Sequence, residues 1–598
     1  MTWQIARHSH LANYIVPHRI ANFAATYNHL RPPFMKQFIE CVPNISEGRD
    51  MQKINTIARE VETVEGVKLL DIDPGKSTNR TVITFVGEPE AVIEAAFRLI
   101  KKAAELIDMS KHKGEHPRMG ATDVCPLIPI AGIEMDEVVK YARKLGERVG
   151  KELGIPGYFY EYAATQPKRK NLAFCRQGEY EALDKLSNPE MKPDFGPAEF
   201  SSAVKKTGAT AISARDFLVA YNVNLNTTST RRANSIAFDI REAGRIKREG
   251  DPLTGKVLTD ENGEPLREEG TLKAVKGIGW YIEEYGIAQL SLNLTNINIT
   301  PVHIAFDEAS RKAQERGIRV TGSEIVGLVP LKSLIDAADY FLRKQERSTG
   351  ISESEKIKIA VKSLGLNDLA PFDPSKKVIE YMIRDAGAKK LIDHSLIGFA
   401  DETASESPAP GGGSVAAYCG ALGISLATMV ANLSAHKRGW DDRWEEFSAY
   451  AEQGQALKNQ LMEAVDEDAN AFRLIMDAFG MAKDTPEETT ARKKAIEDAT
   501  RTAASVPLKV ARLAAQSFEM IRAMVEKGNP NSMTDAGVGA LCARAAVKGA
   551  VMNVRVNLMG FADKEFVKNA LAEAEELERT AEKEEREIVE IVNRKIAQ

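Results

Sequence analysis

A short segment near residue 115 concentrates side chains that can exchange protons. The sequence "SKHKGEHPRMGATD" (110–123) carries His112, His116, Arg118 and Asp123 between glycines and a proline. An imidazole close to carboxylates can act as a general base near neutral pH. Loops held by a rigid scaffold are common places for such groups. The residue types alone do not choose between the two histidines, and a solvated basic turn is the alternative interpretation.

Two other loops place polar side chains at the ends of predicted strands. The segment "DIDPGKSTNRTV" offers Asp73, Asn79 and Arg80, and the segment "VPNISEG" offers Asn44. The first is not a phosphate-binding P-loop, because it lacks the first glycine of that motif and a strand follows it instead of a helix. Its polar groups are nevertheless suited to binding an anionic substrate.

One carboxylate in the second half of the chain interrupts an apolar helix face. A helix predicted over 457–479 has an apolar stripe that includes Leu461 and Val465, and the next position of that stripe is Asp468. Asp466 and Glu467 fall off the stripe. A carboxyl group among apolar neighbours has a raised pKa, which suits general acid–base work. A buried aspartate with a structural hydrogen bond is the alternative.

Two glycine-bearing loops precede predicted helices in the same half. "PAPGGGSVAA" contains Gly411, Gly412, Gly413 and Ser414, and "NPNSMTDAG" contains Asp535. Backbone N–H groups at a helix start can bind an anion or a flat polar ligand. A helix cap with a tight packing contact would explain both loops equally well.

The elements that must position these residues form two similar α/β subdomains. Each follows the order β-α-β-β-α-β, which is that of the ferredoxin-like, split βαβ unit. The first has predicted strands at 38–43, 67–72, 81–87 and 122–130 and helices at 51–64 and 89–109; the second has strands at 218–225, 271–282, 286–295 and 318–330 and helices at 229–244 and 301–316.

After about residue 386 the strand signals stop. The rest of the chain is rich in alanine and has helical periodicity, which predicts an all-α bundle. We therefore expect a multidomain protein with a first α/β subdomain at 35–216, a second at 217–385, a linker at 386–393 and a helical domain at 394–598.

Composition excludes several classes of protein. The 598 residues are too many for one domain, and the net charge of −5 disfavours a nucleic-acid binder. The apolar runs look too short and too often interrupted by charge for a membrane span. Five scattered cysteines without a C-x-x-C pair argue against a disulfide framework or a zinc site, and they fit a reducing cytoplasm.

The first 34 residues differ from the rest. They contain four of the nine histidines and no acidic residue. Such a segment could be a transit peptide; the alternative is that translation begins at Met35 and that residues 1–34 are an upstream extension.

Several longer motifs resemble a known family. "FIECVPNISEG", "DIDPGKSTNRTVITFVG", "LIDMSKHKGEHPRMGATDVCP", "GIGWY" and "LVPLKSLIDAADYF" resemble glutamate formimidoyltransferases. "PAPGGGSVAA", "VDEDANAF" and "VPL" resemble formimidoyltetrahydrofolate cyclodeaminases. The two sets occur in this order in the bifunctional formimidoyltransferase-cyclodeaminase family, and the resemblance covers about residues 35–598.

This resemblance implies a function in histidine breakdown. The first half would transfer a formimidoyl group from N-formimidoyl-L-glutamate to tetrahydrofolate, and the second half would close the product to 5,10-methenyltetrahydrofolate and release ammonia. The family's catalytic histidine corresponds to His116, and its catalytic carboxylate corresponds to Asp468. Arg118 and Asp123 would orient groups near the histidine.

The family also implies where folate binds and what else is needed. Folate contacts would fall on a segment of this chain after "PDF" that comprises Gly196, Pro197, Ala198, Glu199, Phe200, Ser201, Ser202, Ala203, Val204 and Lys205. The co-substrate would be polyglutamylated tetrahydrofolate, without metal or nicotinamide. The protein would be a cytoplasmic homo-oligomer with small-molecule substrates and no nucleic-acid or membrane partner.

Three alternatives to the bifunctional reading are open. The donor could be N-formyl-glutamate, because the acid–base needs of the two transfers are similar. The helical half could be a cyclohydrolase, or it could bind folate without catalysis. A folate-binding or cytoskeleton-associated scaffold that has lost catalysis is a further class, but the presence of both His116 and Asp468 argues against it.

Overall fold

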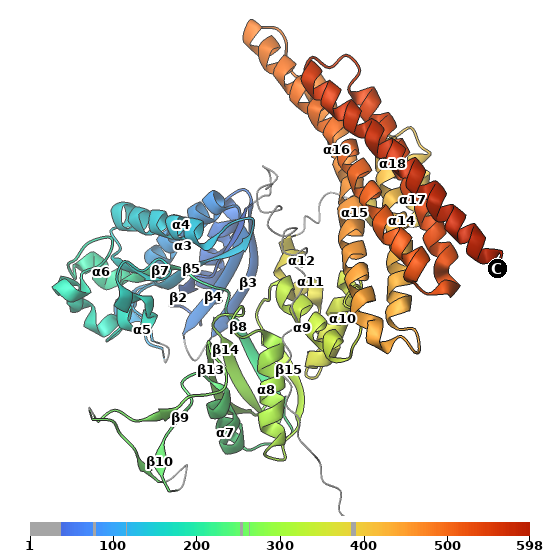
Figure 1. Cartoon of the computed structure of the whole chain (residues 1–598). Helices are drawn as coiled ribbons and strands as arrows, with labels where there is room; N and C mark the ends of the chain where they lie inside the picture. The colour runs from blue at the N-terminus through green and yellow to red at the C-terminus, as the bar shows by residue number, and fades with distance from the viewer. Residues whose placement is uncertain (1–36, 76–78, 115–116, 251–254, 262, 384–389) are drawn as a thin grey trace, which may run out of the picture. The chain divides into compact units, whose positions relative to one another are not determined.

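The computed structural model describes residues 37–75, 79–114, 117–250, 255–261, 263–383 and 390–598 (Figure 1). The predictions for residues 1–34, for His116 and for residues 386–389 of the linker lie outside this part of the chain. The described residues form two compact units that meet at residues 217 and 218 in the sequence.

The first unit is built on one seven-stranded sheet. In spatial order the sheet runs from β3 through β4, the pair β1 and β2, β5 and β7 to β6. The strands up to β5 pair antiparallel, whereas β5 with β7 and β6 with β7 pair parallel. The strands are β1 (Phe38–Cys41), β2 (Asn44–Ile45), β3 (Val67–Gly75), β4 (Arg80–Gly87), β5 (Thr122–Ala131), β6 (Gly157–Glu161) and β7 (Thr210–Ala214).

Sequence patterning predicts four strands in this unit and misses β6 and β7. Both are only five residues long, and β7 ("TAISA") is made mostly of small side chains, so neither gives a clear alternation. Between them lies a long connection, 162–209, made of short helical turns and the helix α6 (Ser202–Thr207). This connection carries the segment expected to bind folate.

Three helices cover the sheet of the first unit. They are α2 (Met51–Arg59), α3 (Pro89–Leu106) and α4 (Met135–Arg148), and their apolar faces join the buried strand residues in one core. The short helix η3 (Met109–Lys111) follows α3 and leads into the loop before β5. The loop with the acid–base residues is therefore anchored at both ends by core elements.

The second unit begins with a four-stranded antiparallel sheet. Its order is β13–β14–β8–β15, with the helices α7 (Thr230–Ile240) and α8 (Val302–Gln314). The strands are β8 (Val219–Leu225), β13 (Val275–Ile282), β14 (Ile287–Leu294) and β15 (Val320–Val326). The chain order of these six elements is the predicted one. The polar segment between α7 and β13 forms short two-stranded ladders that project away from this sheet (Figure 1).

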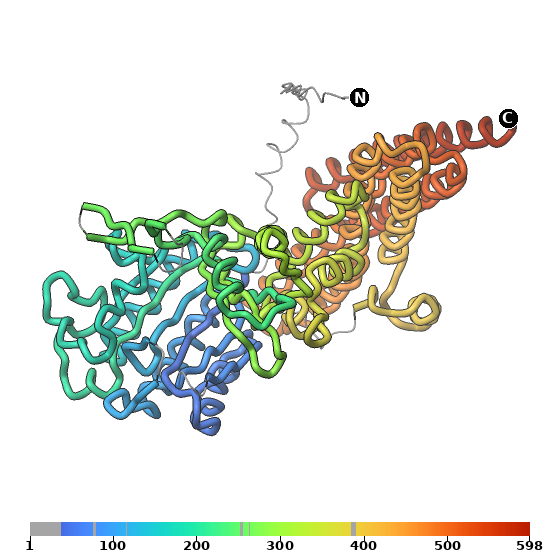
Figure 2. Tube along the Cα trace, turned by 90° about the horizontal axis from the view of Figure 1, so that it is seen from below, coloured from blue at the N-terminus to red at the C-terminus, as the bar shows by residue number. Residues whose placement is uncertain are grey.

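The remainder of the second unit is helical. After α9 (Leu331–Lys344) and α10 (Glu353–Leu364), five long helices pack against one another. They make up the part of the tube that runs from yellow-orange to red in Figure 2. They are α14 (Gly412–Ala435), α15 (Trp444–Gly480), α16 (Pro486–Lys527), α17 (Met533–Asn557) and α18 (Lys564–Ile596). The prediction of α/β sheets followed by a helical region is confirmed.

Alanine fills much of the helical core. Helices α14, α16 and α17 contribute many buried alanines and glycines, which let helix backbones approach closely. A Cβ atom added at Gly423 of α14, for example, would stand 2.8 Å from the carbonyl oxygen of Gly539 in α17. The small side chains thus set the spacing of the helices that carry the second candidate site.

Helix α14 corrects one expectation from composition. It has 24 residues and an uncharged window of mean hydropathy 1.6, so among the described residues one helix is long and apolar enough to cross a membrane. The expectation that no run has this length is therefore wrong. In the structure 61% of that window is buried within the protein, as is usual for the central helix of a bundle.

Candidate active sites

His112 stands at the end of η3 with both ring nitrogens engaged. The Nε of Arg118 donates to Nδ1 at 3.3 Å, so Nε2 must carry the ring proton, and it donates to the backbone carbonyl of Asn79 at 2.9 Å. Burial lowers the pKa of His112, and the charge of Arg118 lowers it further. His112 is therefore a neutral imidazole that holds two loops together.

Arg118 links this histidine to a segment far along the chain. Its guanidinium donates to Glu179 at 3.1 Å and to Glu181 at 2.6 Å and 2.8 Å. Only 10% of the Arg118 side chain is exposed, whereas the side chains of Glu179 and Glu181 are 40% and 64% exposed. The ion pairs raise the pKa of Arg118, with the hydrogen bonds to Glu181 as the largest cause. Arg118 is thus fixed in place rather than available to move toward a substrate.

A second cluster of charged side chains lies near the ends of the neighbouring strands. Asp123 is fully buried and binds the guanidinium groups of Arg80 and Arg176, the latter at 2.7 Å. Its other oxygen accepts from the backbone N–H of Met119 at 3.0 Å. Arg80 also donates from Nε to the side-chain oxygen of Asn44 at 2.9 Å. Burial lowers the pKa of Arg80 despite its carboxylate partner.

Asn79 connects the two groups. Its φ of 50° lies in the left-handed region that asparagine tolerates better than most residues. Its side-chain oxygen accepts from the N–H of Gly48 at 3.0 Å, and its amide nitrogen donates to the carbonyl of Lys113 at 2.9 Å. Sequence analysis singled out Asn44, Asn79, Arg80, Arg118 and Asp123 in three separate loops, and the structure brings these five residues together.

Two other predicted residues differ from this group. Asp73 lies on β3 opposite Val82, and its side chain is exposed. The prediction for His116 lies outside the described residues. The hydrogen bond between His112 and Arg118 nevertheless closes the loop on either side of that position.

The segment expected to bind folate borders this cluster. Tyr180 donates its N–H to the carbonyl of Arg118 at 2.9 Å and its hydroxyl to the carbonyl of Lys205 at 2.5 Å. Ser201 caps α6 by accepting from the N–H of Val204. The ring of Phe200 is 39% exposed and meets Tyr180 edge-on, with ring centroids 6.4 Å apart.

Most of this segment is open to solvent. Gly196 has a φ of 75°, and a Cβ atom there would stand 2.4 Å from the carbonyl oxygen of Ile155, so only glycine fits. Val204 is the buried member of the segment; Gly196, Glu199, Phe200, Ser201, Ser202, Ala203 and Lys205 are exposed, and Pro197 and Ala198 are partly buried.

Sequence reasoning missed the partners in the long connection. Arg176, Glu179, Tyr180 and Glu181 all come from one stretch, "RQGEYE". In the sequence this stretch resembles a solvated polar loop, and no periodicity or motif distinguishes it. Only the folding of the connection against the loop before β5 brings these side chains to Arg118 and Asp123.

The second candidate site centres on Asp468 of α15. Its carboxylate stands 2.9 Å from the hydroxyl of Ser414, which also lies 3.0 Å from the carbonyl oxygen of Val465. Burial raises the pKa of Asp468, and the hydrogen bonds from Ser414 offset part of that effect. The stripe argument for Asp468 therefore agrees with its surroundings.

The hydroxyl of Ser414 can serve both protonation states of the acid. When Asp468 is ionised, Ser414 donates to it. When Asp468 is protonated, the acid donates to Ser414, which can then donate to Val465. A carboxyl group that keeps a hydrogen-bond partner in both states is suited to take up and return a proton.

The glycines of the α14 start allow this approach. A Cβ atom at Gly413 would stand 2.1 Å from a carboxylate oxygen of Asp468. At Gly412 it would be 3.5 Å from the side-chain amide of Asn553, which α17 brings to the same place. Gly411 is the N-cap and has open space around it. Asn553 gave no signal in the sequence, because its helix places it there only through packing.

The neighbours of Asp468 partly contradict the stripe argument. Asp466 was expected off the buried face, but it is half-buried, and one oxygen accepts from the N–H of Leu391 at 2.7 Å. Burial raises its pKa as well. The reason is that Leu391, in the predicted linker, lies against this side of α15. Glu467 pairs with Lys509 of α16 at 2.8 Å, near the edge of the site.

Asp535 does not join this site. It lies in the first turn of α17, whereas Asn553, near Gly412, lies eighteen residues further along the same helix. At 1.5 Å per residue the two are about 27 Å apart. In the part of the chain that the structure describes, no group of three or more His, Cys, Asp or Glu side chains is placed to hold a metal ion.

Comparison with known proteins identifies the family of this chain. Models of the formiminotransferase domain match residues 38–215 (its N-terminal subdomain) and 220–384, and a formiminotransferase-cyclodeaminase model matches residues 395–576. The mouse formimidoyltransferase-cyclodeaminase is 44% identical over 534 residues, which cover 89% of this chain and 94% of the relative. The chain belongs to the formimidoyltransferase-cyclodeaminase family.

Two further relatives show how the family's parts are distributed. The formimidoyltransferase-cyclodeaminase of Dictyostelium discoideum is 39% identical and spans 94% of this chain and the whole relative. The glutamate formimidoyltransferase of Thermoplasma acidophilum is 42% identical over 51% of this chain and 92% of its own length. The expected membership of the bifunctional family is confirmed.

Proposed function

We propose that this protein is a bifunctional folate enzyme. It transfers the formimidoyl group of N-formimidoyl-L-glutamate to tetrahydrofolate, giving 5-formimidoyltetrahydrofolate and glutamate. It then converts that product to 5,10-methenyltetrahydrofolate and ammonia, in the breakdown of histidine. The match to formimidoyltransferase-cyclodeaminases along nearly the whole chain carries this conclusion. The names of these relatives do not favour a transferase-only enzyme.

In the transferase, His116 acts as the general base. It takes the proton from N5 of tetrahydrofolate as that nitrogen attacks the formimidoyl carbon. It then gives a proton to the glutamate nitrogen as the bond between that nitrogen and the formimidoyl carbon breaks and glutamate leaves. The support is positional, since the loop that carries this residue is fastened by the bond between His112 and Arg118 and by Asn79. Arg80, which Asp123 and Asn44 hold, supplies positive charge for an anionic substrate.

In the cyclodeaminase, Asp468 relays the proton. N10 of the folate attacks the formimidoyl carbon and loses its proton, and the departing nitrogen gains a proton as the C–N bond breaks and ammonia leaves. One carboxyl group can perform both transfers if its pKa is raised toward neutrality, and burial acts on Asp468 in this direction. Ser414 keeps the carboxyl group aligned throughout.

Folate is held by segments near these acid–base groups. Residues 196–205 contact it in the transferase, supported by the exposed ring of Phe200 and by the link through Tyr180 to Arg118. In the cyclodeaminase the first turn of α14 contacts it. The co-substrate is the polyglutamylated form, neither metal nor nicotinamide takes part, and the protein is a cytoplasmic homo-oligomer.

We also propose that both α/β regions have the ferredoxin-like fold, with the domain bounds given in the sequence analysis. Supporting this, β1 with β2, β3, β4 and β5 follow the order β-α-β-β-α-β with antiparallel pairing, and β8, β13, β14 and β15 do the same. The transferase subdomains span 35–216 and 217–385, and after a linker at 386–393 the cyclodeaminase spans 394–598.

The test follows both products in one reaction. The full-length protein is mixed with tetrahydrofolate and N-formimidoyl-L-glutamate, and ammonia and methenyl absorbance are recorded together. Wild type forms both, Asp468→Asn accumulates 5-formimidoyltetrahydrofolate, and His116→Ala forms neither. Consumption of N-formyl-glutamate alone, or hydrolysis of added methenyltetrahydrofolate without ammonia release from the formimidoyl form, would contradict the proposal.

A further inference from the structure

Asn553 of α17 presents an unused hydrogen-bond acceptor beside Asp468. Its amide nitrogen donates to the carbonyl oxygen of Gly549, one turn back in the same helix, at 2.8 Å. Because a carbonyl oxygen can only accept, this bond fixes which end of the amide is nitrogen and turns the side-chain oxygen, Oδ1, away from its own helix. No described residue donates to Oδ1, and the atom is not shut off from solvent. A bound molecule can therefore donate an N–H to it.

This oxygen and the carboxyl group of Asp468 lie next to consecutive residues of α14. A Cβ atom at Gly413 would stand 2.1 Å from an oxygen of Asp468, and one at Gly412 would stand 3.9 Å from Oδ1 of Asn553. Consecutive Cα atoms are about 3.8 Å apart, and neither glycine has a side chain that would separate the two groups. A small group bound against the Asp468 carboxyl can therefore also reach Asn553.

A proline in α16 explains how this part of α17 is held. Pro507, in the segment "VPL", is buried inside α16 and has no N–H, so the carbonyl oxygen of Ala503 lacks its usual helical donor. The side-chain amide of Asn557 in α17 donates to that oxygen at 2.7 Å. Asn557 follows Asn553 by one turn, on the same side of α17. The acceptor that the proline leaves free therefore fixes the turn of α17 that carries Asn553.

Helix α16 is also tied to α15 at this level of the bundle. Lys509 follows Pro507 by two residues and pairs with Glu467 at 2.8 Å. Glu467 directly precedes Asp468 in α15. Contacts from one stretch of α16 thus reach α15 beside Asp468 and α17 beside Asn553. The spacing of these two side chains, which come from different helices, is set by α16.

The reacting group of the folate offers the hydrogen bond that Asn553 lacks. In the proposed reaction the formimidoyl nitrogen carries N–H groups and becomes more positive as it gains a proton and leaves. An amide oxygen accepts such an N–H, and its partial negative charge favours the protonated nitrogen. A formyl group has an oxygen in the same position, which cannot donate. A site built on such a bond rejects an analogue that lacks the donor.

We propose that Asn553 selects the formimidoyl over the formyl group in the cyclodeaminase by accepting an N–H of the departing nitrogen, and that Asn557 with Pro507 positions it. The inference rests on the proposed function, because that function supplies the formimidoyl group. N10 adds to the carbon of the protonated formimidoyl group, and Asp468 takes the N10 proton and passes it to the departing nitrogen. The bond between that nitrogen and the carbon then breaks with its electron pair on nitrogen, giving ammonia and the methenyl cation. Asn553 exchanges no proton.

The first test supplies 5-formimidoyltetrahydrofolate to the full-length protein and records ammonia. Asn553→Leu removes both polar amide atoms at similar volume. We expect kcat to fall about a hundredfold, as on loss of one hydrogen bond made to developing charge, while KM rises less. 5-Formyltetrahydrofolate should inhibit this variant more strongly than wild type, because an acceptor no longer faces its formyl oxygen.

Asn553→Asp tests whether the acceptor itself matters. This variant keeps an oxygen that accepts hydrogen bonds, so it retains more activity than Asn553→Leu. Its negative charge beside Asp468 also raises the pKa of that carboxyl group. The limb of the pH–rate profile that reports Asp468 therefore moves to higher pH, which a merely structural role of Asn553 would not produce.

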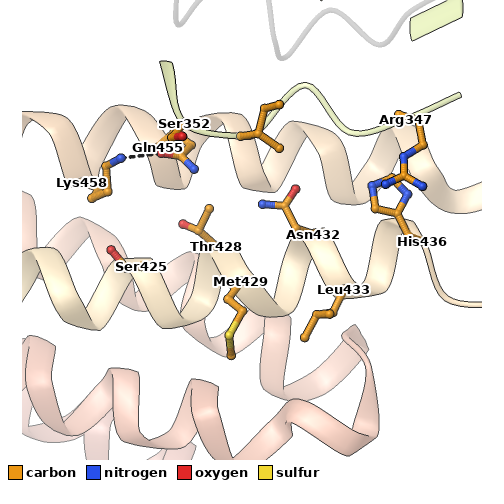
Figure 3. Close-up of a pocket in the computed structure, with 11 residues that line it drawn as sticks. Arg347, Ser352, Ser425, Thr428, Met429, Asn432, Leu433, His436, Gln455 and Lys458 are labelled. Carbon is orange, nitrogen blue, oxygen red and sulfur yellow. Dashed lines mark hydrogen bonds between the residues drawn. The ribbon is translucent and has the colours of Figure 1, made fainter. Parts of the chain in front are cut away.

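Asn432→Leu is the matched control. Asn432 is also a half-buried helix residue, and its amide nitrogen donates to a backbone carbonyl, that of Gly350, at 2.8 Å. It lines a pocket of about 620 Å³ between the segment after α9 and the helices α14 and α15 (Figure 3). Along α14 it is eighteen residues from Ser414, about 27 Å away. We expect this variant to keep the kcat of wild type and its inhibition by 5-formyltetrahydrofolate.

The positioning role is tested by separating it from stability. Asn557→Ala leaves the Ala503 carbonyl without a donor, so Tm falls, and the shift of α17 lowers kcat about tenfold. Adding Pro507→Ala gives that carbonyl a backbone N–H, so Tm recovers, but α17 stays untied and kcat stays low. Recovery of kcat together with Tm would show that the tie only stabilises the fold, and it would overturn the positioning role.

The remaining outcomes separate this inference from the proposed function. If wild type releases ammonia and Asn553→Leu matches it in kcat, or if 5-formyltetrahydrofolate inhibits both equally, the selecting role of Asn553 is wrong and the proposed function stands. An unmoved pH limb in Asn553→Asp likewise places Asn553 away from the reacting group. If wild type releases no ammonia from 5-formimidoyltetrahydrofolate, the proposed function fails and this inference fails with it.

Discussion

In the first unit the groups around His112 and Asp123 are held by charge, whereas in the second unit Asp468 is held by burial. Arg80, Arg118 and Arg176 are each paired with carboxylates, and their positions follow from those pairs. Asp468 has a hydroxyl and helix backbone for neighbours instead. The first arrangement fixes geometry and keeps a histidine neutral; the second tunes a carboxyl group for proton transfer. Replacing an aspartate should therefore affect stability differently in the two regions.

The largest expected difference compares two aspartates. Asp123→Asn takes the buried negative charge from Arg80 and Arg176, and breaking such a pair costs about 3–5 kcal/mol. Asp468→Asn leaves stability at pH 7 equal or slightly higher, because the raised pKa means that folding disfavours the ionised form. Hydrogen–deuterium exchange of peptides from β5 and from α15 measures the change in stability in each of the two variants. Equal protection of β5 in Asp123→Asn and wild type would contradict the charge-held description.

The next comparison uses two glycines at the start of α14. Gly413→Ala puts a methyl group 2.1 Å from an oxygen of Asp468, so the carboxylate must move. A misplacement of about 1 Å can cost about a hundredfold in rate. We expect a loss of this order in ammonia release, with formimidoyl transfer retained. Gly411→Ala meets no atom within 4 Å and is the matched control. A similar loss in both variants would show that α14 needs flexibility rather than space.

The smallest effect concerns the pH dependence of ammonia release. Hydrogen bonds from Ser414 stabilise the ionised form of Asp468 and so lower its pKa against the effect of burial. Ser414→Ala removes the side-chain bond, and the limb of the pH–rate profile that reports Asp468 moves to higher pH. Stability falls by about 0.5–1.5 kcal/mol. Ser505→Ala, whose hydroxyl bonds only within α16, leaves the limb in place. A shift to lower pH would contradict the role given to Ser414.

The two regions also differ in how far the sequence could predict them. Asp468 was found by counting helical positions, because a long regular helix carries its apolar face in its sequence. The same counting failed for Asp466, since Leu391 of the predicted linker lies against it. Around His112, the sequence identified Asn79, Arg80, Arg118 and Asp123 as polar groups in loops. It did not show that Glu179, Glu181 and Arg176 pair with them, because no local pattern encodes contacts some 60 residues apart.

The sequence by itself determined the order of elements, the helical character of the second half and, through its motifs, the family. Strand alternation and helical periodicity are local properties of the sequence, so they can be recognised before the fold is known. Tertiary structure alone decided that His112 is neutral with both nitrogens engaged, and that Asp123 is buried against two arginines. Those properties depend on burial and on distances between remote segments, and both exist only once the chain has folded.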